Sequence, residues 1–99
     1  MKITIESEGP AATISPEGRI DTVTAPELEE AVSGLLRDTT SLVFDFAKVE
    51  YISSAGLRVL LMAHKAMKKS GGSMSVANIP PLVEEVFRIT GFSDVFAIV

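Results

Sequence analysis

The chain has 99 residues, 46% of them hydrophobic, and a net charge of −4, which suits one compact domain over residues 1–99. It has no cysteine and a single histidine, so disulfides, thiolate metal sites and multi-histidine metal sites are excluded, and we expect no metal and no cofactor. The acidic balance opposes a nucleic-acid surface, and no stretch approaches the roughly 20 apolar residues of a membrane span, so we expect a cytoplasmic protein without direct membrane insertion.

The N-terminal segment predicts two strands. Ile3 and Ile5 alternate with polar residues in "KITIESEG", and an extended pattern resumes in "AATISPEGRI" after the turn residues Gly9 and Pro10. We therefore expect the fold to open with a hairpin.

The segment "TAPELEEAVSGLLR" predicts a first helix. Thr24 is placed as its N-cap, Pro26 lies in the first turn, and Glu27 stands three residues after the cap, which predicts a capping box. An apolar stripe at helical spacing follows, made of Leu28, Ala31, Val32, Leu35 and Leu36.

The segment "SLVFDFAKVEYI" predicts a central strand. Apolar residues follow one another in it, with Val43 between Leu42 and Phe44. This pattern is typical of a strand that is covered on both faces of the sheet.

The hydrophobic period changes to that of a helix at about Ser54, and Gly71 and Gly72 end this second helix. Its last turns hold the basic run "HKAMKK", interpreted as a solvated helix end where cations suit the macrodipole. A strand in "SMSVANI" follows. A third helix in "LVEEVFRIT" ends at Gly91, and its apolar residues are Leu82, Val83, Val86, Phe87 and Ile89. A turn with a last strand or apolar tail in "FSDVFAIV" completes the chain. The order predicts an α/β fold with a mixed sheet of four or five strands and helices packed mainly on one face.

The stretch "EYISSAGLRVLLMAHK" places Ser53 and Ser54 where the central strand gives way to the second helix. The serine-hydrolase pattern GxSxG is absent, and His64 lies about 15 Å along the helix from Ser54 at 1.5 Å per residue. We therefore expect no enzymatic activity, and we interpret His64 as a partly buried helix residue.

Ser54 has two interpretations on spacing alone. It is either an ordinary helix cap or an exposed hydroxyl that another protein phosphorylates, because a phosphate there would face the free N–H groups of the helix. Ala55 and Gly56 are small enough to let a kinase approach, and the alternative for Gly56 is close packing on the sheet.

The segment "VEYISSAGLRVLL" resembles the signature of the STAS domain, in which a strand ends in a D-S-[ST/A]-G-L turn before a helix. "GRIDTVTAPEL", "LVFDFAKV" and "GGSMSVANIPPLVEEVFRITGFSDVF" resemble further parts of that family, so the similarity covers nearly the whole chain. Ser53 stands where the family usually has aspartate, and Ser54 matches the phosphoacceptor serine.

The resemblance to single-domain members implies an anti-sigma factor antagonist. Such a protein binds an anti-sigma factor that is a serine kinase, releases a sigma factor, is inactivated by phosphorylation, here at Ser54, and is restored by a serine phosphatase. The partner surface expected from this resemblance consists of Asp21, Thr22, Ser53, Ala55, Gly56, Leu57 and Arg58. We expect Leu57, Arg58 and Leu61 to form an exposed docking patch. Asp21 and Thr22 end the strand before the first helix, and we expect them to lie near the Ser54 turn in the proposed sheet. Asp21 is as readily a turn former as a partner contact.

Two other functions remain open from the sequence. The chain could be a STAS subunit that scaffolds a membrane transport complex without a phosphorylation cycle. Binding of a nucleotide or other small molecule beside Ser54 has less support, because no glycine-rich phosphate loop is present.

Overall fold

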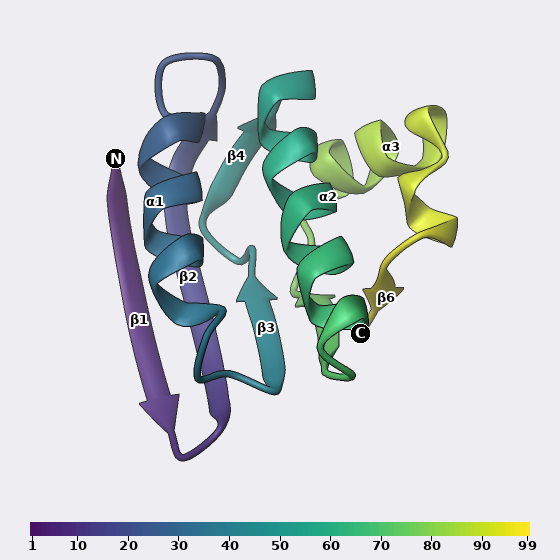
Figure 1. Ribbon diagram of the computed structural model, residues 1–99. Helices are drawn as coiled ribbons and strands as arrows, with labels where there is room; N and C mark the ends of the chain where they lie inside the picture. The colour runs from purple at the N-terminus through teal and green to yellow at the C-terminus, as the bar shows by residue number, and fades with distance from the viewer.

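The computed structural model describes residues 1–99 (Figure 1). Its strands are β1 Lys2–Glu8, β2 Ala11–Ile20, β3 Ser41–Asp45, β4 Val49–Ile52, β5 Ser73–Ala77 and β6 Ala97–Ile98. Its helices are α1 Ala25–Leu35, α2 Ser54–Lys69 and α3 Pro81–Thr90, and a 3₁₀ turn, η1, spans Phe92–Asp94. The predicted N-terminal hairpin, the three helices and the mixed sheet are confirmed.

The strands form one six-stranded sheet with the order β1-β2-β3-β5-β6, and β4 pairs with β2 beyond the end of β3. The β1–β2 pair is antiparallel, whereas every other pair is parallel. The sequence predicted one central strand where the structure has both β3 and β4. Asp45 ends β3, because its Oδ1 accepts the N–H of Ala47 at 3.0 Å and the side-chain amide of Asn78 at 3.1 Å. This break and the short β6 explain why the sheet has six strands instead of four or five.

The helices cover one face of the sheet, as predicted. In Figure 1, α1 and α2 lie in front of the strands, and α3 extends the same layer because Phe87 packs on Phe46, with ring centroids 6.2 Å apart. The expectation that the central strand is covered on both faces is wrong. Val43 lies level with Thr13 and Ser75 on the open face, and all three are only partly buried. The open face of the sheet around Val43 therefore carries small polar side chains, which favour contact with water.

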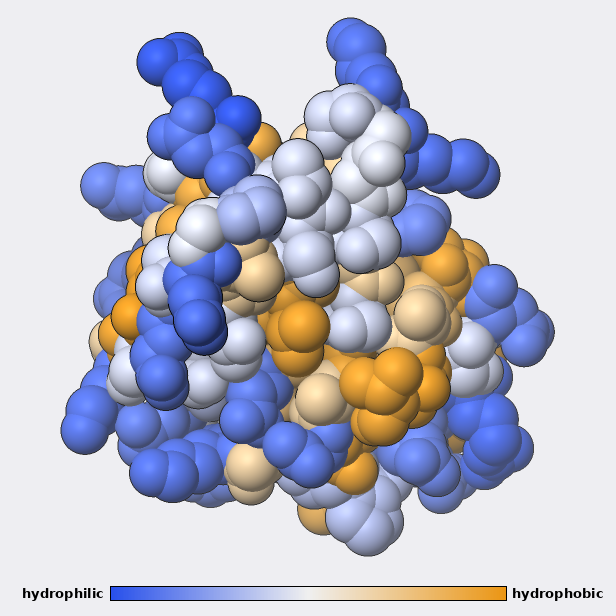
Figure 2. All heavy atoms as spheres, turned by 90° about the horizontal axis from the view of Figure 1, so that it is seen from below, coloured by the Kyte–Doolittle hydropathy of each residue, from blue (hydrophilic) through white to orange (hydrophobic).

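The core lies between the sheet and the helices. It contains 21 buried apolar residues, including the aromatic rings of Phe44, Phe46, Phe87 and Phe96. His64 packs edge to face against Phe96 at 5.6 Å and is partly buried, so the interpretation of this residue as a helix packing residue is confirmed. Seen from below, an apolar area lies next to near-neutral residues, and hydrophilic residues occupy most of the periphery (Figure 2).

The start of α1 differs from the predicted capping box. Thr24 occupies the N-cap position, yet its side chain makes no cap hydrogen bond to the helix. The carboxylate of Glu27 instead forms an ion pair with the N-terminal amino group of Met1 at 3.0 Å. The capping-box prediction is therefore wrong, because both side chains have partners outside the helix.

The buried faces of the helices follow their apolar periodicity with one exception. In α3, Val83 and Phe87 are buried as expected, but Leu82 and Ile89 point outward with exposed fractions of 76% and 71%. No helix of the protein has the length and apolar character that a membrane crossing requires.

Candidate functional site

The turns that follow β2 and β4 lie side by side at one edge of the sheet. Ile20 pairs with Ile52 at the ends of these parallel strands, and the N–H of Ser53 donates to the carbonyl of Ile20 at 2.8 Å. The carboxyl ends of adjacent parallel strands necessarily meet at the same edge. The predicted proximity of Asp21 and Thr22 to the Ser54 turn is therefore confirmed (top of Figure 1).

Asp21 organises the turn between β2 and α1. Its Oδ1 accepts the backbone N–H groups of Val23 at 3.0 Å and of Thr24 at 3.1 Å. Thr24 completes the turn, since its hydroxyl accepts the N–H of Asp21 at 2.9 Å and donates to the carbonyl of Arg19 at 2.7 Å. Asp21 is thus a turn former.

These hydrogen bonds lower the pKa of Asp21 from its ordinary value of 3.8, with the N–H of Thr24 as the largest cause. The charged carboxylate therefore stabilises the folded state above pH 3.8, and this contribution is lost as the pH falls through the lowered pKa of the folded state. We expect Asp21→Ala to melt below the wild type at pH 7, with a difference that shrinks in acid.

Thermal melts between pH 2 and pH 7 test this expectation. Asp21→Asn serves as the control, because its amide oxygen accepts the same N–H groups without a charge. It should melt closer to the wild type than Asp21→Ala does at pH 7. A difference between Asp21→Ala and the wild type that is the same at every pH would contradict the role of the carboxylate.

Ser53 and Ser54 open α2 in two different environments. Ser53 is the N-cap residue, its side chain makes no cap hydrogen bond, and its Oγ is buried without any partner. Ser54 is the first helical residue and is exposed. Of the two hydroxyls, only that of Ser54 is accessible to a modifying enzyme.

Because the hydroxyl of Ser53 has no hydrogen-bond partner, its removal should have little effect on the stability of the fold. Replacing a bonded N-cap serine by alanine costs about 0.5–2 kcal/mol. Because Ser53 makes no such bond, we expect Ser53→Ala to change the free energy of unfolding by no more than about 0.5 kcal/mol. Urea unfolding followed by circular dichroism measures this change, and a loss above about 1 kcal/mol would show that Ser53 caps the helix in solution.

Gly56 and Leu57 contribute little to the exposed surface at the start of α2. Both are buried, and a Cβ atom on Gly56 would lie 2.6 Å from Ile20 Cγ2 and 2.6 Å from Ile52 Cγ1. The glycine lets α2 approach the ends of β2 and β4, which is the packing alternative left open by the sequence. The expectations that Gly56 keeps a partner surface clear and that Leu57 is exposed are therefore wrong.

Two hollows flank the first turns of α2. The hollow between α1 and α2 has a volume of about 420 Å³. It is lined by Thr22, Ala25, Pro26, Glu29, Glu30, Ser33, Ala55, Arg58 and Val59. The hollow between α2 and the C-terminal end of α3 has a volume of about 270 Å³ and is lined by Ser54, Leu57, Arg58, Leu61, Thr90 and Phe92. Arg58 borders both, so its exposed side chain stands on the ridge between them.

Several residues of this edge carry no signal in the sequence. Val23 is an apolar residue at the turn after β2 and is 80% exposed. The sequence favours Glu29 and Glu30 only as acidic residues that suit the start of the helix dipole, yet they line the same hollow as Arg58. Glu29 and Glu30 are adjacent exposed residues of α1, and this pattern does not indicate that α2 lies beside them.

The functional groups at this edge are the hydroxyls of Ser54 and Thr22, the guanidinium group of Arg58, backbone N–H groups at a helix start, and the carboxylates of Asp21, Glu29 and Glu30. Residues of the His, Cys, Asp and Glu types form no group of three that could hold a metal ion. His64 lies too far along α2 to accept a proton from Ser54, since ten residues of helix span about 15 Å.

Comparison with known proteins identifies the fold and its relatives. The STAS domain family matches residues 2–99. BtrV of Bordetella bronchiseptica, described as a candidate anti-sigma factor antagonist, is 31% identical over 99 residues, which are 99% of this chain and 85% of BtrV. The anti-sigma-B factor antagonist of Bacillus subtilis is 35% identical over 81 residues, which are 82% of this chain and 74% of that protein.

A solved structure agrees with these relatives. The crystal structure of an anti-sigma factor antagonist from Mycobacterium paratuberculosis superposes with a TM-score of 0.87 at 30% identity, over 98% of this chain and 83% of that chain. Both the sequence match and the arrangement of strands and helices thus extend over almost all residues. The chain belongs to the STAS domain family, and its named relatives are anti-sigma factor antagonists.

Proposed function

We propose that this protein is a cytoplasmic anti-sigma factor antagonist. It binds an anti-sigma factor that has serine kinase activity and thereby releases a sigma factor. Phosphorylation of Ser54 by that kinase ends the binding, and a serine phosphatase restores it. The protein acts by binding, without a reaction of its own and without a cofactor.

The observation that carries this proposal is the position of Ser54. Its exposed hydroxyl lies at the first residue of α2, beside a hollow and next to the exposed Arg58 one turn later. A phosphate at a helix N-terminus is stabilised by the free N–H groups and by the macrodipole, so the folded protein can carry the modification. An added dianion in the middle of a docking surface opposes binding of a partner.

The names of the relatives support the class of partner. Antagonists of anti-sigma factors are similar to this chain over at least 71% of its length, in several bacterial genera. The exposed edge offers Thr22, Val23 and Arg58 to such a partner, and Ala55 is partly exposed between them. Asp21 contributes to this edge mainly by shaping the turn after β2 with its carboxylate, and Ser53 contributes its backbone hydrogen bond to Ile20.

Incubation with the anti-sigma factor kinase encoded in the same genome and ATP tests the proposal. We expect mass spectrometry to locate a single phosphate on Ser54, no phosphate on the Ser54→Ala variant, and normal phosphorylation of Ser53→Ala. A phosphate on Ser53, or none on the wild type, would contradict the proposal. Stable association with a transport permease in its place would support the scaffold function.

A further inference from the structure

The charges of this protein are unevenly distributed between α2 and the rest of the chain. Four of the nine Lys and Arg residues lie on α2, and none of the thirteen Asp and Glu residues does. The helix therefore carries +4, whereas the rest of the chain carries −8. We call Arg58, Lys65, Lys68 and Lys69 the basic stripe.

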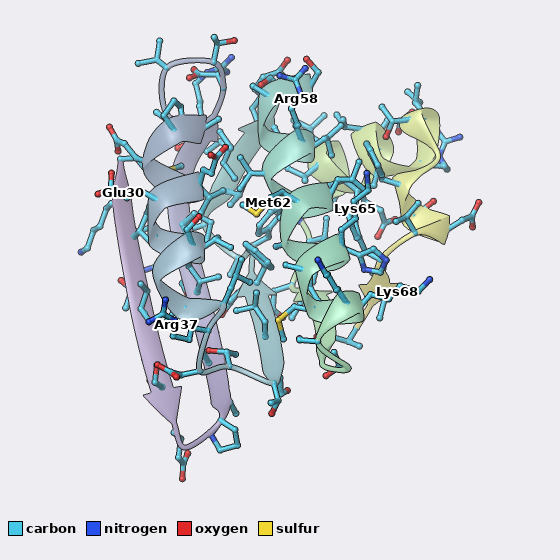
Figure 3. All side chains as sticks on the ribbon, viewed as in Figure 1. Glu30, Arg37, Arg58, Met62, Lys65 and Lys68 are labelled. Atoms are coloured by element: carbon cyan, nitrogen blue, oxygen red, sulfur yellow. The ribbon has the colours of Figure 1, made fainter.

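The basic stripe begins at the candidate phosphorylation site. Spacings of four, seven and four residues place Ser54, Arg58, Lys65 and Lys69 on one side of the helix, and Lys68 neighbours Lys65 at a spacing of three residues. All four basic residues are exposed. Figure 3 shows Arg58, Lys65 and Lys68 following one another along α2 from its N-terminal end.

None of the four cations has an acidic partner. The ion pairs of the protein involve Met1, Lys2, Arg19 and Arg88 as cations, all outside α2. Lys68 and Lys69 suit the C-terminal end of the helix dipole. Arg58 and Lys65 lie outside the last turn, where the dipole effect has fallen off, so the dipole does not explain their placement. Helix stability therefore does not explain the stripe as a whole.

We propose that the basic stripe binds an acidic segment of the protein that docks at Ser54; this inference rests on the proposed function and names the chemistry of its partner. Charge complementarity selects an acidic occupant. The occupant must also be narrow, because Glu29 and Glu30 of α1 line the hollow beside Arg58 and place negative charge next to the stripe. These carboxylates repel a broad anionic surface such as a membrane, but leave room for a single segment along α2.

The stripe also gives the phosphorylation switch an electrostatic mechanism. A phosphate on Ser54 adds about −1.5 to −2 charges one turn from Arg58, at the i and i+4 positions that pair on a helix. The phosphate would neutralise the end of the stripe nearest the docking edge. An acidic segment then loses attraction and meets a like charge.

Stopped-flow association with the anti-sigma factor kinase tests the stripe. For the unmodified wild type, we expect the association rate constant to fall about tenfold or more between 50 and 300 mM salt, the range in which electrostatic steering is screened. The variant Lys65→Gln/Lys68→Gln/Lys69→Gln should associate about tenfold more slowly at low salt and lose most of this salt dependence. Circular dichroism would verify that each variant is folded.

The matched control removes three exposed cations outside α2, as Lys2→Gln/Arg37→Gln/Lys48→Gln. It changes the net charge by the same amount and should associate at nearly the wild-type rate. Equal slowing of both triple variants, or a wild-type rate that ignores salt, would overturn the stripe while leaving the proposed function intact. Tighter binding to vesicles containing phosphatidylserine than to the kinase would also overturn it. Failure of the wild type to bind the kinase at all would overturn the proposed function and the stripe together.

Discussion

Gly56→Val should destabilise the fold by about 3 kcal/mol or more, the upper end of what overpacking a core costs. A Cβ atom alone would lie 2.6 Å from side-chain carbons of both Ile20 and Ile52, and valine adds two methyl groups to that clash. Domains of this size have total stabilities of about 5–15 kcal/mol. The melting temperature should therefore fall by about 12 °C or more, since 1 kcal/mol shifts it by roughly 4–8 °C. Differential scanning calorimetry measures this shift.

Gly34→Val provides the matched control for this substitution. Gly34 is also a helical glycine, but a Cβ atom there would meet no atom within 4 Å. Valine is slightly better than glycine inside a helix, so Gly34→Val should leave the melting temperature unchanged or raise it. A Gly56→Val variant that melts like the wild type would show that the contact between α2 and the strand ends is not close in solution.

Ser54→Asp should weaken binding to the anti-sigma factor kinase by about 2–5 kcal/mol, the range expected for an unpaired charge in an interface. Ser54→Ala should bind like the wild type and should resist inactivation by ATP. Both variants should fold, because Ser54 is exposed and a carboxylate at a helix N-terminus is favourable. Fluorescence anisotropy of a labelled sigma factor measures how much of it each variant releases from its complex with the kinase.

Ser54→Asn separates charge from size in this experiment. Asparagine has nearly the shape of aspartate but no charge, so it should release the sigma factor almost as well as the wild type. If Ser54→Asn and Ser54→Asp lose the same binding free energy, bulk at the docking edge and not charge would be responsible.

Local sequence patterns predicted the elements well, because each depends on its own residues. Alternation in β1 and β2, the change of period near Ser54 and the glycine after α3 correspond to the observed hairpin, the start of α2 and the left-handed Gly91 cap. The break between β3 and β4 was not predictable in the same way. Besides the local bond from Ala47, the carboxylate of Asp45 accepts a hydrogen bond from Asn78, which lies 33 residues away in the sequence.

In the candidate site, too, features set by neighbouring residues were predicted, and contacts between distant elements were not. The sequence placed Ser54 at a strand–helix junction and Asp21 beside it, since both follow from strand order and helix start signals. It failed for Gly56 because the space needed at a helical glycine depends on which side of α2 faces Ile20 and Ile52. It failed for the capping box because the amino group of Met1 and the Asp21 turn compete for the capping side chains.

The basic stripe illustrates a pattern that the sequence contains but does not explain. The run "HKAMKK" was interpreted as a solvated helix end, which accounts for Lys68 and Lys69. The structure adds that Arg58 and Lys65 lie on the same exposed side and that none of these cations is paired. Whether a cation of α2 forms an ion pair depends on the neighbouring elements, and no carboxylate of α1 forms one with Arg58, Lys65, Lys68 or Lys69.

Isothermal titration calorimetry of the unmodified and the Ser54-phosphorylated protein against the anti-sigma factor kinase tests the central claim most directly. The phosphorylated form is prepared with the kinase and ATP and verified by mass spectrometry. The account predicts a tight complex for the unmodified protein and an affinity weaker by at least tenfold for the phosphorylated one, which corresponds to about 1.4 kcal/mol or more. Equal affinities of the two forms would contradict the proposed switch.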